Sequence, residues 1–265
     1  MYNVGFIGCG NMGYAIMKGI SESSLKENVK IHAFDIKKES SERCSNFATV
    51  CASEKEIFQN CKYVFLAVKP QVIDTVLNTI KDYVTKDTVI VSILAGITGE
   101  YIKSQTIPDA KVVLVMPNTP LLLNEGASAL AKVEPVTDDE FNFVRSIFDS
   151  CGKTAVLTPD KMKEVIAING SSPAFIYLYA KAFIEYATEN GISEKSATDL
   201  FAQSLIGSAK MITNSGYSLN ELIKMVSSPG GTTLAGLDEL YKGNLVDITK
   251  KCCDSCTKRA YELSK

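Results

Sequence analysis

Short apolar runs that are typical of buried strands alternate with amphipathic helical patterns along residues 1–158. The strands are predicted at residues 4–7, 29–34, 63–68, 88–94, 112–116, 127–131 and 154–157. Capping-box spacings at Ser53/Glu56 and Thr137/Glu140 predict the starts of two helices. Repeated strand–helix units predict an α/β fold with a doubly wound parallel sheet, whose ligands bind at the carboxyl ends of the strands.

From Pro159 onward the pattern changes to helices without convincing strands. These helices are predicted at residues 161–168, 173–190, 193–214, 219–226 and 233–241. Residues 174–187 are apolar nearly all round, and a helix of that kind is normally buried, here most simply in a subunit interface. We therefore expect two domains, residues 1–158 and an all-helical domain of residues 159–265.

The composition is that of an ordinary globular protein, with 46% hydrophobic and 22% charged residues and a net charge of −2. This charge gives no reason to expect a nucleic acid or an anionic membrane as a partner. No apolar run reaches membrane-spanning length and the first residues already enter a strand, so we expect a cytoplasmic protein. In that setting the eight cysteines are expected to be reduced apolar fillers. Cys253 and Cys256 have the spacing of a metal or redox pair, but no second pair lies nearby and the only histidine, His32, is far away, so no metal is expected.

A glycine motif, Gly8-Cys9-Gly10-Asn11-Met12-Gly13, lies between the first strand and a helical pattern. In this context the motif is typical of dinucleotide binding: one glycine forms the turn, the next lets the pyrophosphate approach, and the third lets helix pack on strand. Asp35 follows the second strand, where a carboxylate can accept hydrogen bonds from ribose hydroxyls and repel a 2′-phosphate. Lys37 and Lys38 can offset that repulsion, so the sequence favours NADH without excluding NADPH.

A second glycine-containing segment, Ser227-Ser228-Pro229-Gly230-Gly231-Thr232-Thr233, lies between two predicted helices. Backbone N–H groups at the start of the following helix, with two threonine hydroxyls, predict a site for a small anion such as a carboxylate. The alternative is a Ser-Pro turn followed by a threonine N-cap.

The candidate proton donors restrict the reaction. His32 lies within a predicted strand and is not a plausible donor. Lys69, Lys161 and Lys163 are candidate donors, although the sequence favours a solvated surface position for each of them. Reduction of a ketone usually needs such a donor, whereas a protonated C=N bond already carries positive charge and needs mainly positioning. A carboxylate site beside a threonine hydroxyl therefore suits a cyclic imino acid better than a hydroxy acid.

Taken together, these motifs resemble the pyrroline-5-carboxylate reductase family over nearly the whole chain. The matching segments are residues 4–13 (VGFIGCGNMG), 65–70 (FLAVKP), 116–120 (MPNTP), 125–126 (EG), 170–175 (GSSPAF) and 226–233 (VSSPGGTT). The resemblance implies an N-terminal Rossmann domain, a helical substrate-binding and dimerisation domain, and often a ring of dimers. It also implies NADPH- or NADH-dependent reduction of 1-pyrroline-5-carboxylate to L-proline.

The resemblance also implies the roles of individual residues. The cofactor residues would be Ile7, Gly8, Cys9, Gly10, Asn11, Met12 and Gly13 at the pyrophosphate, Asp35 and Lys37 at the adenosine ribose, and Ala67, Val68, Lys69, Pro70 and Ala95 at the nicotinamide half. The substrate residues would be Ser228, Gly230, Gly231, Thr232 and Thr233, with Thr233 also reaching the ring nitrogen as the catalytic residue.

Three positions depart from the usual family pattern. Ser172 and Phe175 replace a glycine and a tyrosine, and Asp35 stands where a small polar residue commonly serves a 2′-phosphate. Two alternatives therefore stay open: a reductase of a related cyclic imine, or a non-catalytic dinucleotide-binding relative.

Overall fold

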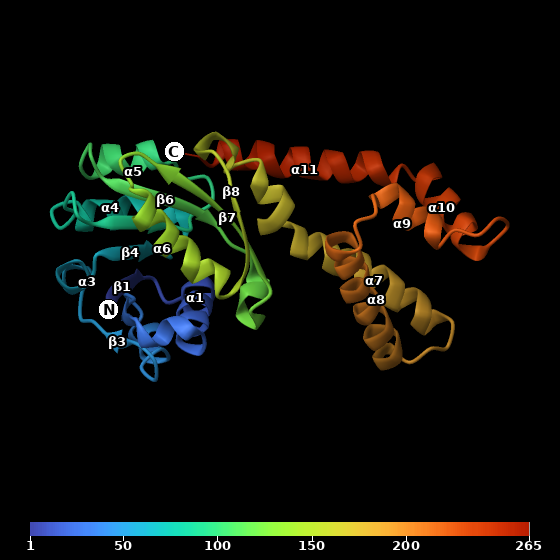
Figure 1. Cartoon of the computed structure of the whole chain (residues 1–265), viewed down its shortest axis with the longest axis horizontal. Helices are drawn as coiled ribbons and strands as arrows, with labels where there is room; N and C mark the ends of the chain where they lie inside the picture. Colours follow the sequence, from blue (N-terminus) through green and yellow to red (C-terminus); the bar gives the residue numbers. More distant parts are fainter. Residues whose placement is uncertain (265) are drawn as a thin grey trace. The chain divides into compact units, whose positions relative to one another are not determined.

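The computed structural model describes residues 1–264 (Figure 1). It divides into two compact units, one of residues 1–173 with the end of the chain from Ser255, the other of residues 174–254. The first unit thus continues past residue 158, the boundary predicted from the sequence, and also takes in the chain's last helical turns.

Eight strands form a single sheet in the first unit, in the order β3-β2-β1-β4-β5-β6-β7-β8. Their bounds are β1 Tyr2–Ile7, β2 Val29–Phe34, β3 Thr49–Val50, β4 Tyr63–Leu66, β5 Val89–Ser92, β6 Lys111–Met116, β7 Gly126–Val133 and β8 Gly152–Val156. The predicted Rossmann-like α/β fold is confirmed. Strands β1 to β6 are parallel, which brings the carboxyl ends of β1, β4 and β5 to one edge of the sheet.

The predicted parallel arrangement does not extend to the last two strands. β7 runs antiparallel to β6, and β8 is parallel to β7. The connection from Met116 to Gly126 contains only a short 3-10 turn, Thr119–Leu123. A parallel neighbour would need a crossover of a dozen or more residues, so this short connection reverses the chain instead.

Six α-helices cover the two faces of the sheet, as a doubly wound fold requires. They are α1 Asn11–Glu22, α2 Lys38–Glu42, α3 Glu54–Asn60, α4 Ile73–Ile80, α5 Gly99–Gln105 and α6 Asp138–Asp149. One buried cluster joins α1 and α6 to side chains such as Phe6 and Phe65, and a second joins α3, α4 and α5 to Val64 and Leu66 on the other face. The capping box of Thr137 and Glu140 is confirmed at the start of α6.

The segment predicted as a helix at residues 161–168 is wrong in detail. It consists of a 3-10 turn, Pro159–Lys161, and a π-helical turn, Ile166–Gly170. The Asn169 side-chain amide donates hydrogen bonds to the carbonyl oxygens of Met116 (2.6 Å) and Ala127 (2.9 Å). These bonds tie the segment to two strands and hold its backbone in the wider π-helical turn. In that turn the Ser171 amide donates a hydrogen bond to the carbonyl of Ile166 at 2.8 Å.

The helices of the second unit expose most of their apolar side chains. They are α7 Ser172–Glu189, which begins in the first unit, α8 Glu194–Asn214, α9 Leu219–Met225, α10 Thr232–Lys242 and the first part of α11 Leu245–Glu262. Phe183 stacks on Phe201 at 4.3 Å between ring centroids, yet Ala197 is the one buried hydrophobic residue within 174–254. Such an apolar surface is typical of a subunit interface. None of the described helices has the length and hydrophobicity needed to cross a membrane.

Candidate active site

The glycine motif forms a tight turn between β1 and α1. Gly8 has a φ of +102°, and a Cβ at this position would lie 2.5 Å from the carbonyl oxygen of Ala67. A Cβ at Gly13 would lie 2.3 Å from the carbonyl oxygen of Gly8. Backbone is therefore packed on backbone at both positions, and neither tolerates a larger residue.

Gly10 differs from its two neighbours in the motif, because no described atom would lie within 4 Å of a Cβ there. Gly10 is also the N-cap of α1, whose first-turn N–H groups consequently lack a capping side chain. An open approach to a helix N-terminus fits the pyrophosphate of a dinucleotide. The residues present thus fit the cofactor that the sequence predicts.

The Asp35 carboxylate connects the end of β2 to this turn. Its Oδ2 accepts a hydrogen bond from the backbone N–H of Cys9 (2.8 Å), and its Oδ1 accepts one from the N–H of Lys37 (2.8 Å). Both bonds fix the direction of the carboxylate. Burial raises the pKa of the adjacent Cys9 thiol far above its ordinary value, and this side chain is 0% exposed.

A pocket of about 650 Å³ opens beside Asp35. Its other lining residues include Ile36, Ser41, Val50, Cys51 and Ala52, none of which was predicted as a site residue. Arg43 was also missed: its guanidinium donates to the carbonyl of Cys9 (2.8 Å) and lies 4.4 Å from the ring centroid of Tyr14. The short strand β3, which brings residues 49–52 to this pocket, has too few residues to give a hydrophobic pattern.

The other predicted cofactor residues lie at the same edge of the sheet. The N–H of Ala67 donates to the carbonyl of Ile7 (2.9 Å), so the segment 67–70 directly borders the glycine motif. Ala95 is exposed in the loop after β5, beside Gly96, whose φ is +79°. The structure therefore brings together the predicted residues of the motif, β2, β4 and β5.

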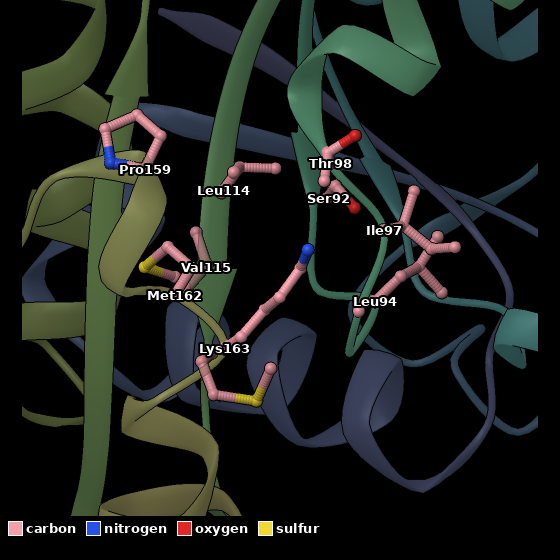
Figure 2. Close-up of a pocket in the computed structure, with 11 residues that line it drawn as sticks. Ser92, Leu94, Ile97, Thr98, Leu114, Val115, Pro159, Met162 and Lys163 are labelled. Atoms are coloured by element: carbon pink, nitrogen blue, oxygen red, sulfur yellow. The ribbon is translucent and has the colours of Figure 1, made fainter. Parts of the chain in front are cut away.

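The predicted proton donors have more ordinary surroundings. His32 lies in β2, with Nδ1 3.8 Å from the Cys51 thiol, and burial lowers its pKa. Lys69 is exposed, and Lys161 pairs with Asp160 at 3.3 Å. Lys163 instead lines a small cavity behind the loop that follows β5 (Figure 2).

The second glycine segment, in the other unit, joins α9 to α10. Gly230 has a φ of +70°, and Gly231 rather than a threonine is the N-cap of α10. The alternative of a threonine N-cap is thus wrong, and Thr232 and Thr233 form the exposed first turn of the helix. The Gly231 N–H donates to the carbonyl of Ser228 (3.0 Å), so this amide, unlike the prediction, is already engaged within the turn.

The eight cysteines are free thiols, of which Cys9, Cys44, Cys51, Cys61 and Cys151 are buried. Within residues 1–264, no group of three or more potential metal-ligating side chains is arranged to hold an ion.

Comparison with known proteins covers both parts of the chain. Residues 159–263 match the family described as pyrroline-5-carboxylate reductase dimerisation, and residues 3–96 match the family described as NADP oxidoreductase, coenzyme F420-dependent. The pyrroline-5-carboxylate reductase of Escherichia coli (strain K12) is 31% identical over 264 residues, 99% of this chain and 98% of that protein. The reductase of Staphylococcus aureus (strain COL) is 32% identical over 267 residues, 98% of this chain and 97% of that protein.

Two solved structures are similar over the whole chain. The Plasmodium falciparum pyrroline carboxylate reductase with NADP bound has a TM-score of 0.91 and 27% identity, and the match covers 100% of this chain and 98% of that one. The pyrroline-5-carboxylate reductase from Coxiella burnetii has a TM-score of 0.90 and 30% identity, with 100% and 99% covered.

Proposed function

We propose that this chain, which belongs to the pyrroline-5-carboxylate reductase family, binds its dinucleotide at the glycine motif and its substrate at the Ser228–Thr233 segment. The protein is an NAD(P)H-dependent oxidoreductase that reduces the C=N bond of 1-pyrroline-5-carboxylate to give L-proline. The observation that carries the assignment of the dinucleotide site is the glycine motif, in which Gly8 and Gly13 are closely packed and Gly10 is open.

Residues 7–13 hold the pyrophosphate in this proposal, with the N-terminus of α1 directed at its negative charge. Asp35 and Lys37 face the adenosine ribose. Each carboxylate oxygen of Asp35 accepts one backbone N–H and still has a lone pair for a ribose hydroxyl. This arrangement favours NADH, while the lysines at positions 37 and 38 keep NADPH possible.

The nicotinamide half lies against Ala67, Val68, Lys69 and Pro70 after β4, and against Ala95 after β5. Support for this placement comes from the parallel arrangement of β1, β4 and β5, since ligands of such sheets bind at the carboxyl ends of the strands. When bound, NAD(P)H supplies the hydride that reduces the C=N bond.

The substrate carboxylate is held by the first turn of α10. Backbone N–H groups of Thr232 and Thr233, and the Ser228 hydroxyl, are the donors, with Gly230 and Gly231 allowing close approach. The Thr233 hydroxyl forms a hydrogen bond with the ring nitrogen. Because a protonated imine is already positive, this chain contributes position rather than a strong acid, and no histidine is needed.

The protein is a homodimer in this proposal, formed through the exposed apolar side chains of the second unit, and dimers assemble into a larger ring. The residue range matched by the dimerisation family and the many exposed apolar side chains within 174–254 both support the dimer. We place the protein in the cytoplasm, with the small-molecule substrate as its other partner. We also retain the domain boundary after residue 158, because the matched dimerisation family begins at residue 159.

The test is oxidation of NADH and NADPH, measured in parallel when 1-pyrroline-5-carboxylate is added to the full-length protein. We expect substrate-dependent oxidation with proline as the product and a higher kcat/KM for NADH. The six-membered homologue of the cyclic imine serves as the comparison substrate. Oxidation of neither cofactor would contradict the activity, and faster turnover of the six-membered imine would reassign the substrate.

A further inference from the structure

Residues 255–264, which are the last turns of α11 and the two residues after it, belong to the first unit and are called the C-terminal segment here. Ala260 is 7% exposed and belongs to the buried cluster that also contains Leu94 and Ile97. The Cys256 thiol lies 3.1 Å from the Ser171 hydroxyl. The C-terminal segment is therefore part of the core beneath the loop that follows β5.

The contact with this loop, residues 93–98, is made by backbone atoms. A Cβ at Gly96 would lie 3.3 Å from the carbonyl oxygen of Ala260 and 3.5 Å from the Cα of Ser264. Gly96 also has a φ of +79°, which a glycine adopts without strain. The loop thus passes directly over the C-terminal segment at the residue next to the exposed Ala95.

Tyr261, adjacent to Ala260, fixes the C-terminal segment from the other side. Its hydroxyl donates a 2.7 Å hydrogen bond to Oε1 of Glu164, and this bond lowers the pKa of the Glu164 carboxyl. The Lys163 ammonium lies 4.5 Å from the centroid of the Tyr261 ring. Two charged neighbours therefore restrain one aromatic side chain.

The same lysine extends into the cavity behind the loop, as Figure 2 shows, with its amine directed towards Ser92. This cavity has a volume of about 30 Å³ and is lined by Gly96, Ile97 and Met162, among others. The Ser92 hydroxyl is buried and has no hydrogen-bond partner among the described residues. A volume of this size accommodates one water molecule, which would join the lysine to the serine at the base of the loop.

We propose that the C-terminal segment positions the loop 93–98, with Tyr261 as a positioning residue that acts through the Ala260 carbonyl and Lys163 on Gly96. The proposal rests on the proposed function in one respect, the placement of Ala95 against the nicotinamide. The segment then controls how well the nicotinamide half of the dinucleotide is held. The adenosine half is unaffected, because Asp35 and the glycine motif are bound by other contacts.

The experiment compares the dissociation constants of NADH and of ADP-ribose, which lacks the nicotinamide, for the full-length protein. For Tyr261→Phe we expect NADH to bind about two- to tenfold more weakly, which is the range expected for the loss of one ordinary, solvent-exposed hydrogen bond. ADP-ribose should change by less than about twofold. Tyr83→Phe is the matched control, because the Tyr83 ring packs against Phe58, at 6.5 Å between ring centroids, and this variant should change neither constant.

A second variant shows whether weaker NADH binding by Tyr261→Phe reflects the lost hydrogen bond or only a less stable fold. Glu164→Gln keeps the side-chain volume and weakens the bond to Tyr261, so it should reproduce the selective loss of NADH affinity. Equal weakening of NADH and ADP-ribose in both variants, or no weakening of either, would overturn the proposal. These binding measurements need no turnover. A failure of the proposed reductase activity is therefore recognised separately, because the wild-type protein would then oxidise neither cofactor when substrate is added.

A double-mutant cycle tests the coupling itself. Gly96→Ala places a methyl group against the Ala260 carbonyl and should also weaken the binding of NADH but not that of ADP-ribose. If Tyr261 acts on the same loop, the combination with Tyr261→Phe should be less damaging than the product of the two single effects. Effects that multiply to within about twofold would show that the two residues act independently and would contradict the proposal.

Discussion

Replacement of Asp35 by serine should change the cofactor preference towards NADPH. The 2′-phosphate carries a charge of about −2, and a carboxylate about 5 Å away repels it by about 2–3 kcal/mol at an effective dielectric constant of about 40–80. Screening by salt reduces this value. At about 1.4 kcal/mol per factor of ten, we expect the ratio of kcat/KM for NADPH to that for NADH to rise about 10- to 100-fold.

The structure also predicts that Asp35→Ser weakens the hydrogen bonds that hold the glycine motif, whichever cofactor is used. Serine cannot accept hydrogen bonds from both Cys9 and Lys37, so the glycine motif is held less firmly. Loss of one charge-assisted bond of this kind costs about 1.5–3 kcal/mol and should weaken both cofactors. Asp35→Asn separates the two effects, because the amide removes the charge but keeps an acceptor oxygen for the Cys9 N–H.

The assay is the initial rate with each cofactor at saturating 1-pyrroline-5-carboxylate, at two salt concentrations. Both variants should raise the ratio, and the rise should be smaller at high salt because the repulsion is already screened in the wild-type protein. A ratio that changes by less than about twofold in both variants would refute the placement of Asp35 at the ribose.

Three other substitutions test separate parts of the structure. Thr233→Ala should lower kcat/KM by about a hundredfold while the dissociation constant of NADH stays the same; unaltered turnover would exclude a role for the hydroxyl. Gly10→Ala should leave the melting temperature unchanged, since no described atom would contact the new methyl group, yet weaken NADH binding at least about tenfold. Gly13→Ala, whose methyl group would meet the Gly8 carbonyl, should also unfold more easily. Glu140→Gln should destabilise the protein by about 2–3 kcal/mol in urea unfolding at pH 7. Burial alone would raise the pKa of Glu140, but hydrogen bonds from Lys111 and Lys62 and from the Thr137 amide lower it to about 2. Because the folded pKa lies below the ordinary value of 4.5, the stabilisation is present above about pH 4.5 and is lost as the pH falls towards 2. A difference between wild type and variant that did not shrink over this range would contradict the reasoning.

The fold could be predicted from the sequence where local patterns decide it. Apolar runs such as residues 63–66 and the cap at Thr137 determine their elements almost alone. The direction of β7 depends instead on the length of its connection from β6, and the π-helical turn depends on hydrogen bonds from Asn169 to two strands distant in sequence. Helix α11 was missed because charged residues such as Lys250, Lys251 and Asp254 interrupt the apolar spacing.

The residues of the candidate site likewise fall into those with a local sequence signal and those whose contacts join distant parts of the chain. Glycine spacing and the acid after β2 identify the turn and Asp35, because both are fixed within one strand–helix–strand unit. Arg43 gives no comparable signal, since its contact with the Cys9 carbonyl arises only when α2 folds back over the turn. Likewise, the contact of Gly96 with Ala260 joins positions that are far apart in the chain and show no shared pattern.

The fully covered thiol of Cys9 can report on the opening of the glycine-motif turn between β1 and α1. An alkylating reagent can reach this sulfur only while the turn is open, whereas the partly accessible Cys252 and Cys253 are open to attack in the closed protein. The labelling rate of Cys9 therefore measures how often the turn opens, and a bound dinucleotide should slow it in proportion to occupancy. The chain thus carries an intrinsic probe of cofactor binding that requires no catalysis.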